Sequence, residues 1–124
     1  MGNPLDDKVA KAKSNRPVYT YTLPAGIADG VTSVGLVALT ADEEIMAARR
    51  SGNDTFRLAY ELAKTSLAEV DGKPVGLADG SVDTAFNRMS SKARNLVLRA
   101  FTEVNSPVED DVTGFLKSRQ VRVG

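Results

Sequence analysis

The sequence contains no cysteine and no histidine. Without cysteine, the chain has no disulfide, no thiolate nucleophile and no cysteine-ligated zinc site. Without histidine, it lacks the side chain that most often moves protons or binds transition metals near neutral pH. These absences exclude much of ordinary enzyme chemistry, so we expect a protein that is not an enzyme and that uses no cofactor.

Neither sign of charge dominates, because 16 Lys and Arg residues balance 16 Asp and Glu residues. No long-range field would therefore steer the chain towards DNA, RNA or an anionic membrane. The most apolar stretch, 31–39, is interrupted by polar residues and glycine and is too short to cross a bilayer as a helix. Asp6 and Asp7 lie where a signal peptide would carry bases, so we expect no export and no membrane partner.

The length and composition are those of one globular domain. Apolar residues make up 42% of the 124 residues and charged residues 26%, a normal balance for a chain that folds around a single core. Residues 1–17 are rich in lysine and contain little that can be buried, so we expect a flexible N-terminal arm. Residues 18–124 show no internal repeat and no clear boundary, and we predict a single mainly helical domain.

Two parts of the sequence have the pattern of β-strands. At 18–23 apolar and aromatic residues alternate with threonine, and a second β-rich run follows at 31–39 after a loop with proline and glycine. These runs predict a short β-ribbon near the N-terminus. An Asp-Gly dipeptide, which suits two successive residues with positive φ, predicts a β-hairpin at Val70–Val75. Pro74 cannot donate a ladder hydrogen bond, so its strand should lie at an edge.

Helix starts are marked by side chains that can accept hydrogen bonds from free backbone amides. Thr40 and Glu43 have the spacing of a capping box, and Gly52 can end that helix in the left-handed conformation. Further starts are expected at Asn53 or Asp54, at Ser81, at Ser90 or Ser91, and at Ser106 followed by Pro107.

Apolar residues recur at helical spacing after three of these starts, which predicts helices with one buried face each. Together with the β-ribbon and the hairpin, they indicate a mainly α, α+β fold class. The alternation of Val121 and Val123 with polar residues indicates a short strand at the C-terminus. The side chains expected to be buried are Phe56, Ala59, Tyr60, Ala63, Leu67, Leu96, Val97, Ala100, Phe101, Val104, Val108, Val112, Phe115 and Leu116.

The acidic residues 109–111 do not predict a metal site. Adjacent residues on a helix point in different directions and converge poorly on one ion, whereas the dipole at a helix N-terminus already favours acids there. Ser91 and Lys92 could form a catalytic dyad only if the lysine were buried with a lowered pKa, and helix capping explains the serine more simply. We therefore expect no metal site and no catalytic residue.

Arg88, Lys92 and Arg99 have intervals of four and seven, which would place them on one helical face as a basic stripe for phosphates. A solvated helix face is the commoner explanation for such a stripe. No aromatic side chain lies between these residues for base stacking, and Glu103 opposes their charge. A small nucleic-acid-binding regulator is therefore a minor alternative.

Apolar side chains provide the remaining candidates for a binding site. Seven Phe and Tyr residues lie on short elements that are not expected to cover all of them, which would leave an apolar groove or an oligomer interface. Core packing is the alternative for the apolar candidates, and arginines could form a polar rim around such a groove. The candidate partner-binding residues are Phe101, Leu98, Phe115, Leu116, Arg94 and Arg57.

Five short motifs follow one another towards the C-terminus: Leu39-Thr40-x-x-Glu43, Ser66-Leu67, Val70-Asp71-Gly72-Lys73, Arg94-x-x-x-Leu98-x-Ala100-Phe101-x-x-Val104-Asn105-x-Pro107 and Phe115-Leu116-x-Ser118. In this order they resemble the tail assembly chaperones of tailed bacteriophages. The resemblance implies a non-enzymatic protein of the host cell cytoplasm that binds the long helical tape measure protein and recruits tail tube subunits. It also implies a homo-oligomer, or multiple copies of the chain on each partner.

A virion structural component, such as a tail, baseplate or capsid decoration protein, is the main alternative. Residues 18–38 match no pattern of the chaperones, and N-terminal arms often link neighbouring subunits, so both features favour a structural role. A chaperone would be absent from purified particles. A structural protein would be retained in the virion at a fixed copy number.

Overall fold

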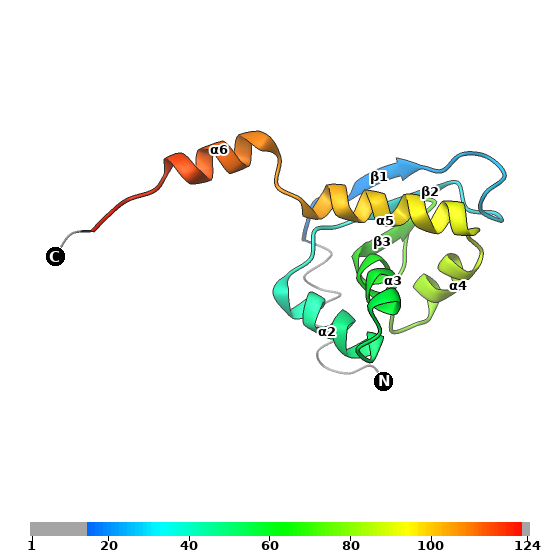
Figure 1. Ribbon diagram of the computed structural model, residues 1–124. Coiled ribbons are helices and arrows are strands. Elements are labelled where there is room, and N and C mark those ends of the chain that lie inside the picture. Colours follow the sequence, from blue (N-terminus) through cyan, green and yellow to red (C-terminus); the bar gives the residue numbers. More distant parts are fainter. Residues whose placement is uncertain (1–14, 123–124) are drawn as a thin grey trace.

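The computed structural model of the protein describes residues 15–122, in which helices cover a small sheet (Figure 1). The strands are β1 (Tyr19–Thr22), β2 (Ser33–Leu36), β3 (Leu67–Val70) and β4 (Lys73–Pro74). The helices are α2 (Ala41–Ser51), α3 (Thr55–Ser66), α4 (Ser81–Asn87), α5 (Ser91–Asn105) and α6 (Glu109–Lys117). This combination confirms the predicted mainly α, α+β fold class.

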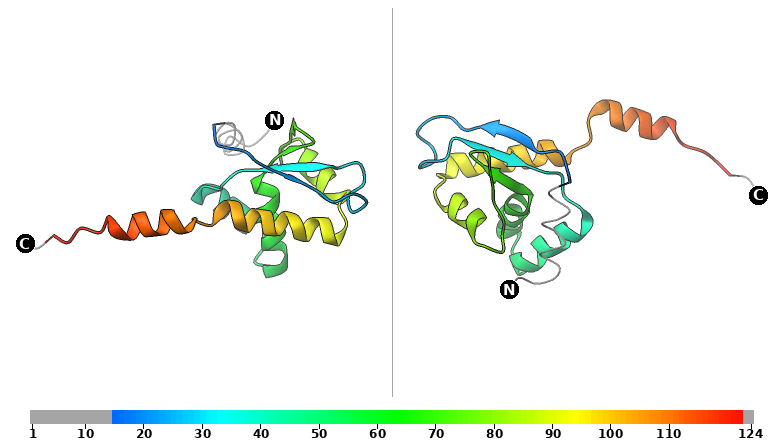
Figure 2. Two further views of the ribbon diagram at one scale, coloured as in Figure 1. Left: turned by 90° about the horizontal axis from the view of Figure 1, so that it is seen from above. Right: turned by 180° about the vertical axis from the view of Figure 1, so that it is seen from behind.

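The strands form one antiparallel sheet in the order β1-β2-β3-β4, and the β1–β2 pair is the ribbon predicted near the N-terminus. Tyr21 lies opposite Val34, and Val34 lies opposite Val70, so apolar side chains align on one face of the sheet. Helices α3 and α5 pack on that face, and α5 runs across it (Figure 2). The core therefore lies between a sheet and one layer of helices.

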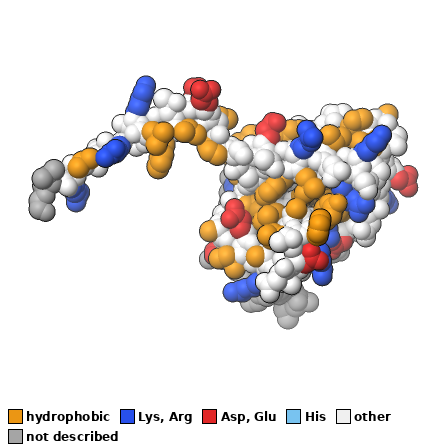
Figure 3. Space-filling model, viewed as in Figure 1, with side chains coloured by type: hydrophobic (Ala, Val, Ile, Leu, Met, Phe, Trp, Pro, Cys, Tyr) orange, Lys and Arg blue, Asp and Glu red, His pale blue; other side chains and the backbone are white. Residues whose placement is uncertain are grey.

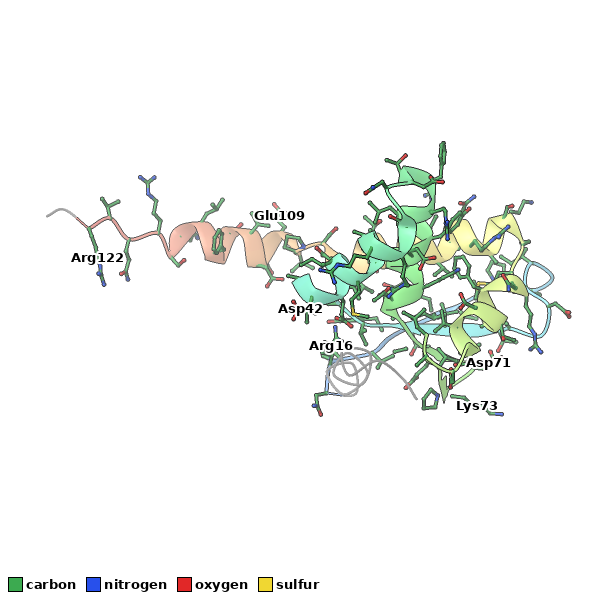
Figure 4. The ribbon with its side chains drawn as sticks, turned by 90° about the horizontal axis from the view of Figure 1, so that it is seen from below. Arg16, Asp42, Asp71, Lys73, Glu109 and Arg122 are labelled. Atoms are coloured by element: carbon green, nitrogen blue, oxygen red, sulfur yellow. The ribbon has the colours of Figure 1, made fainter. Side chains whose placement is uncertain are left out.

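The hairpin between β3 and β4 forms at the predicted position. Asp71 and Gly72 have φ angles of 53° and 78°, the pair of left-handed residues that the Asp-Gly sequence predicts. The strand that contains Pro74 lies at the edge of the sheet, as expected. Asp71 and Lys73 lie together at this turn (Figure 4).

Most of the predicted helix boundaries are confirmed. Thr40 and Glu43 form both bonds of a capping box at the start of α2, and Gly52 ends that helix with a φ of 60°. The Asp54 carboxylate accepts bonds from the first amides of α3, and the Ser90 hydroxyl accepts one from Ala93 at the start of α5. These contacts involve residues close in sequence, which is why spacing alone reveals them.

The start of α4 differs from the prediction, because Gly80 and not Ser81 is the capping residue. Gly80 adopts a left-handed φ of 77° and offers no side chain to the helix. The Ser81 hydroxyl is instead bonded to the backbone of Gly76, and Asp79 accepts a bond from the Ser81 amide. Ser81 therefore ties the preceding loop together and does not cap the helix.

The core confirms part of the predicted buried set. Ala63, Leu67, Val97 and Ala100 are buried. Phe56 is 85% exposed, so its predicted place in the core is wrong. It lies in the first turn of α3, where no other element among residues 15–122 covers it, although its helical spacing is that of the buried residues. Ala59 and Leu96, which were also expected in the core, are exposed as well.

Helix α6 contradicts the prediction most clearly. It begins at Glu109 after Val108, not at Ser106 and Pro107, because residues 106–108 are extended. None of its residues is buried, and it projects away from the body of the molecule (Figures 1 and 2). The predicted burial of Val108, Val112, Phe115 and Leu116 is therefore wrong.

The C-terminal end of the described chain contains no further element. Residues 118–122 form no strand, and the predicted tail strand otherwise lies outside the described residues, as do positions 1–14 of the predicted N-terminal arm. Within residues 15–122, the structure has no helix with the length and apolar character needed to span a membrane.

Candidate protein-binding groove

An open hollow of about 600 Å³ lies between α2, α3 and the end of α5. Most of its exposed surface is apolar, and hydrophobic side chains gather on this face of the body (Figure 3). We refer to it as the apolar groove. Its lining residues are Ala41, Glu44, Ile45, Ala48, Leu58, Leu62, Phe101, Thr102, Asn105 and Ser106.

The groove arises from how α2 divides its residues between two faces. Met46 and Ala47 are buried in the body, whereas Ile45 is 50% exposed and borders the groove. Ala41 lies four residues before Ile45 and Ala48 three residues after it, on the same side of α2. The small side chains of these two alanines leave the hollow open. Ile45, Leu58 and Leu62 are therefore neighbouring apolar side chains that remain at least partly exposed to water at the groove.

The end of α5 is fixed to the start of α2 at one side of the groove. The side-chain oxygen of Asn105 accepts a bond of 2.7 Å from the Leu39 amide, and its side-chain nitrogen donates to the Phe101 carbonyl at 2.9 Å. Asn105 therefore holds Phe101 and the first turn of α2 in a fixed relation, which shapes this side of the groove.

A buried ion pair supports α2 from below. Glu43 is fully buried, and its two carboxylate oxygens accept bonds of 2.6 and 2.9 Å from the Arg16 guanidinium. Arg16 also donates to the Ala38 carbonyl and lies below the start of α2 near Asp42 (Figure 4). Although burial by itself raises the pKa of Glu43, bonds from Arg16 and Thr40 outweigh it and hold that pKa below its ordinary value.

The apolar residues of α6 form a second exposed surface. Val112, Phe115 and Leu116 lie four, seven and eight residues after Val108, the residue that precedes α6, so all four share one side of the helix. Hydrophobic side chains line one side of α6 in Figure 3. Phe115 and Leu116 are 75% and 63% exposed. The acids 109–111 lie in the first turn, as the helix dipole favours.

The predicted partner-binding residues do not form one patch. Phe101 borders the groove and is half-buried, whereas Leu98 is half-buried against the core. The Arg94 guanidinium lies 5.7 Å from the centre of the Tyr60 ring, so it packs between α5 and α3 and does not form a rim. Arg57 is exposed near the start of α3, and Phe115 and Leu116 belong to α6.

Sequence reasoning missed the groove residues Ile45, Leu58 and Leu62. For Leu58 and Leu62, the sequence pattern that could have revealed them is their spacing of four residues on α3, outside the set of residues that was expected to be buried. A helix with apolar residues on two faces usually packs on two sides, and here the second side is the groove.

A smaller cleft of about 220 Å³ lies between β1 and α5. The Tyr21 hydroxyl donates a bond of 3.0 Å to Glu103 at this cleft, and burial together with Glu103 raises the pKa of Tyr21. The cleft is less than half the volume of the apolar groove, so it suits single side chains better than a helix.

The charged clusters considered in the sequence are spread over separate elements. Arg88 follows the last residue of α4, whereas Lys92 and Arg99 lie on α5, so the expected continuous basic stripe on one helix does not exist. Among residues 15–122, no three acidic side chains are grouped so that they could hold a metal ion. Comparison of the chain with protein-family profiles, curated proteins and solved structures finds no match.

Proposed function

We propose that the protein is a non-enzymatic tail assembly chaperone whose apolar groove takes the apolar face of a helix from another polypeptide. The observation that carries the proposal is the groove itself, an open hollow of about 600 Å³ between three helices whose exposed surface is mostly apolar. Binding of an amphipathic helix in such a groove is a common mode of peptide recognition.

The chemistry of the groove suits a long helical client. A tape measure protein exposes apolar helix faces before the tail tube surrounds it, and copies of a small protein bound along it would suppress aggregation. The equal numbers of acidic and basic residues favour binding by apolar contact, which permits release when tube subunits arrive. The resemblance of residues from Leu39 onward to the tail assembly chaperones supports this choice of client.

Coexpression of the protein with the tape measure protein tests the proposal. We expect a complex with several copies of the chain for each tape measure protein. Ile45→Glu places a charge in the groove and should weaken capture by about tenfold or more, because burying an unpaired charge is costly.

Phe56→Glu is the matched control, since Phe56 is exposed and lies outside the groove. It should bind the tape measure protein as the wild type does. A role for the groove is contradicted if the wild type, Ile45→Glu and Phe56→Glu capture the tape measure protein equally well. It is also contradicted if the two variants lose capture to the same extent.

A virion structural component is the second candidate, and the observation that favours it is the projecting helix α6 with its exposed apolar side. Terminal helices of this kind can link neighbouring subunits of an assembly. Quantitative mass spectrometry of purified particles separates the two roles. Presence at a fixed copy number supports the structural role, whereas absence supports the chaperone.

A further inference from the structure

Helix α6 and the apolar groove have complementary shapes and chemistry. Phe115 and Leu116 lie on one side of a nine-residue helix that buries no residue of its own. The groove is an open apolar hollow bounded by helices, and such a hollow is suited to a short helix that offers one apolar face.

The charges at the two ends of the groove define a direction. Helix α2, which borders the groove, has Asp42 and Glu44 in its first turn as a negative end and Arg49 in its last turn as a positive end. Helix α6 has the same polarity along its length as α2, with acids 109–111 in its first turn and Lys117 in its last. Opposite charges therefore meet at both ends when α6 lies antiparallel to α2.

The chain's own α6 cannot adopt this direction easily. The bond between Asn105 and the Leu39 amide fixes the end of α5 beside the start of α2, and only residues 106–108 connect it to α6. If α6 folded back into its own groove, it would enter at the negative end and run parallel to α2. Its acids would then lie against Asp42 and Glu44, and like charges in contact are unfavourable.

We infer that the groove of one copy binds α6 of a second copy, with the helix antiparallel to α2. The inference rests on the proposed function only in treating the groove as a helix-binding site. Each copy offers both a helix and a groove, so the contact joins different surfaces and builds a closed ring or an open row of copies. A nine-residue helix buries less area than a standard interface, so the association is weak and reversible.

The same groove would then serve two helices in turn. A neighbour's α6 covers the apolar side chains while no client is present, and a tape measure helix displaces it. This arrangement keeps the groove out of water in the free protein and lets several copies gather where a client appears.

Analytical ultracentrifugation of the full-length protein tests the inference. The wild-type mass should rise with concentration. Phe115→Glu removes the helix surface and Ile45→Glu the groove surface, so either change should weaken association about tenfold or more. Phe56→Glu is the matched control and should associate like the wild type.

Mixing the two defective variants gives the sharpest result. Phe115→Glu keeps an intact groove and Ile45→Glu keeps an intact α6, so their equimolar mixture should associate, whereas each alone stays monomeric. A mixture that stays monomeric while the wild type associates overturns the inference, and so does a wild type that is monomeric at every concentration.

Cysteine pairs distinguish a second copy from the chain's own helix, because the natural sequence has no cysteine. Glu44→Cys mixed with Lys117→Cys should form a disulfide between chains under mild oxidation. A single chain that carries Glu44→Cys and Glu109→Cys reports the fold-back direction and should give no internal disulfide. Efficient internal closure of that pair, without cross-linking between chains, overturns the inference.

Failure of this inference is separable from failure of the proposed function. Phe115→Glu leaves the groove intact, so it should still capture the tape measure protein, and more readily than the wild type because no α6 competes. If self-association occurs without any binding to the tape measure protein, the inference stands and the proposed client is wrong.

Discussion

At the residue scale, the most consequential contact is the ion pair between Glu43 and Arg16, because Glu43 is fully buried and also completes the cap of α2. We predict that Arg16→Ala lowers the free energy of unfolding by about 3 kcal/mol, since it leaves a buried carboxylate without its cation. Arg49→Ala, which removes an exposed arginine from the same helix, should change it by less than about 0.5 kcal/mol. Urea denaturation measures both values.

The pH dependence gives an independent check of this ion pair. The pKa of Glu43 is lower in the folded chain than its ordinary value of 4.5, so its contribution to stability is complete above that value and is lost as the pH falls through the folded pKa. In Arg16→Ala only burial and the cap remain, and the carboxyl protonates more easily. The stability gap between the two proteins should therefore shrink as the pH falls through the ordinary value of 4.5 towards the lower folded pKa of the wild type. A gap that stays constant from pH 7 to pH 3 contradicts the ion pair.

Two phenylalanines that both lie on helices differ greatly in burial, which the sequence pattern alone does not reveal. Phe86 is 3% exposed and meets Tyr60 edge to face, whereas Phe56 is 85% exposed. Phe86→Ala should lower the free energy of unfolding by about 4 kcal/mol, and Phe56→Ala should change it by less than about 0.5 kcal/mol. Thermal and urea unfolding of both variants test this contrast. A large loss in Phe56→Ala indicates a contact that the structure lacks.

At the scale of elements, one side chain adds to the backbone pairing of β3 with β2 and binds the turn of the β3–β4 hairpin to the segment before β2. The Asp71 carboxylate accepts bonds from the Thr32 amide, the Thr32 hydroxyl and the Ser33 amide at 2.7, 2.6 and 2.9 Å. The bond from the Thr32 hydroxyl is the main reason that the pKa of Asp71 is lowered. Asp71 thus joins the hairpin turn to the segment that begins β2.

Substitution of Asp71 tests this connection. Asp71→Ala should lower the free energy of unfolding by about 1 to 2 kcal/mol, because it removes the acceptor and also places alanine at a φ of 53°. Asp71→Asn keeps one oxygen acceptor and tolerates the left-handed conformation, so it should lose clearly less. Equal losses in the two variants would show that the bonds to Thr32 and Ser33 contribute little.

The elements that sequence predicts well are those defined by local chemistry. The cap at Thr40, the left-handed end at Gly52 and the Asp-Gly turn each depend on residues a few positions apart. Burial is different, because it depends on which element packs against which. Helix α6 has the same apolar spacing as a buried helix, yet the extended residues 106–108 carry it away from any covering surface. The groove was missed for the same reason.

At the scale of the whole molecule, α6 projects away from the body. Helix α6 buries none of its residues, so deletion of residues 107–124 should leave the melting temperature of the dilute protein within about 2 °C of the wild-type value. Differential scanning fluorimetry gives this comparison. A large drop in melting temperature would mean that α6 packs on the body in solution.

The central claim is that the apolar groove is where this protein holds a helix of its partner. Amide hydrogen exchange of the chain, first free at a dilution where it is monomeric and then in complex with the coexpressed tape measure protein, tests that claim most directly. We predict slower exchange in the complex at 41–48, 58–62 and 101–106, the segments that line the groove. A stable complex in which these segments exchange as in the free chain, while protection appears elsewhere, would contradict it.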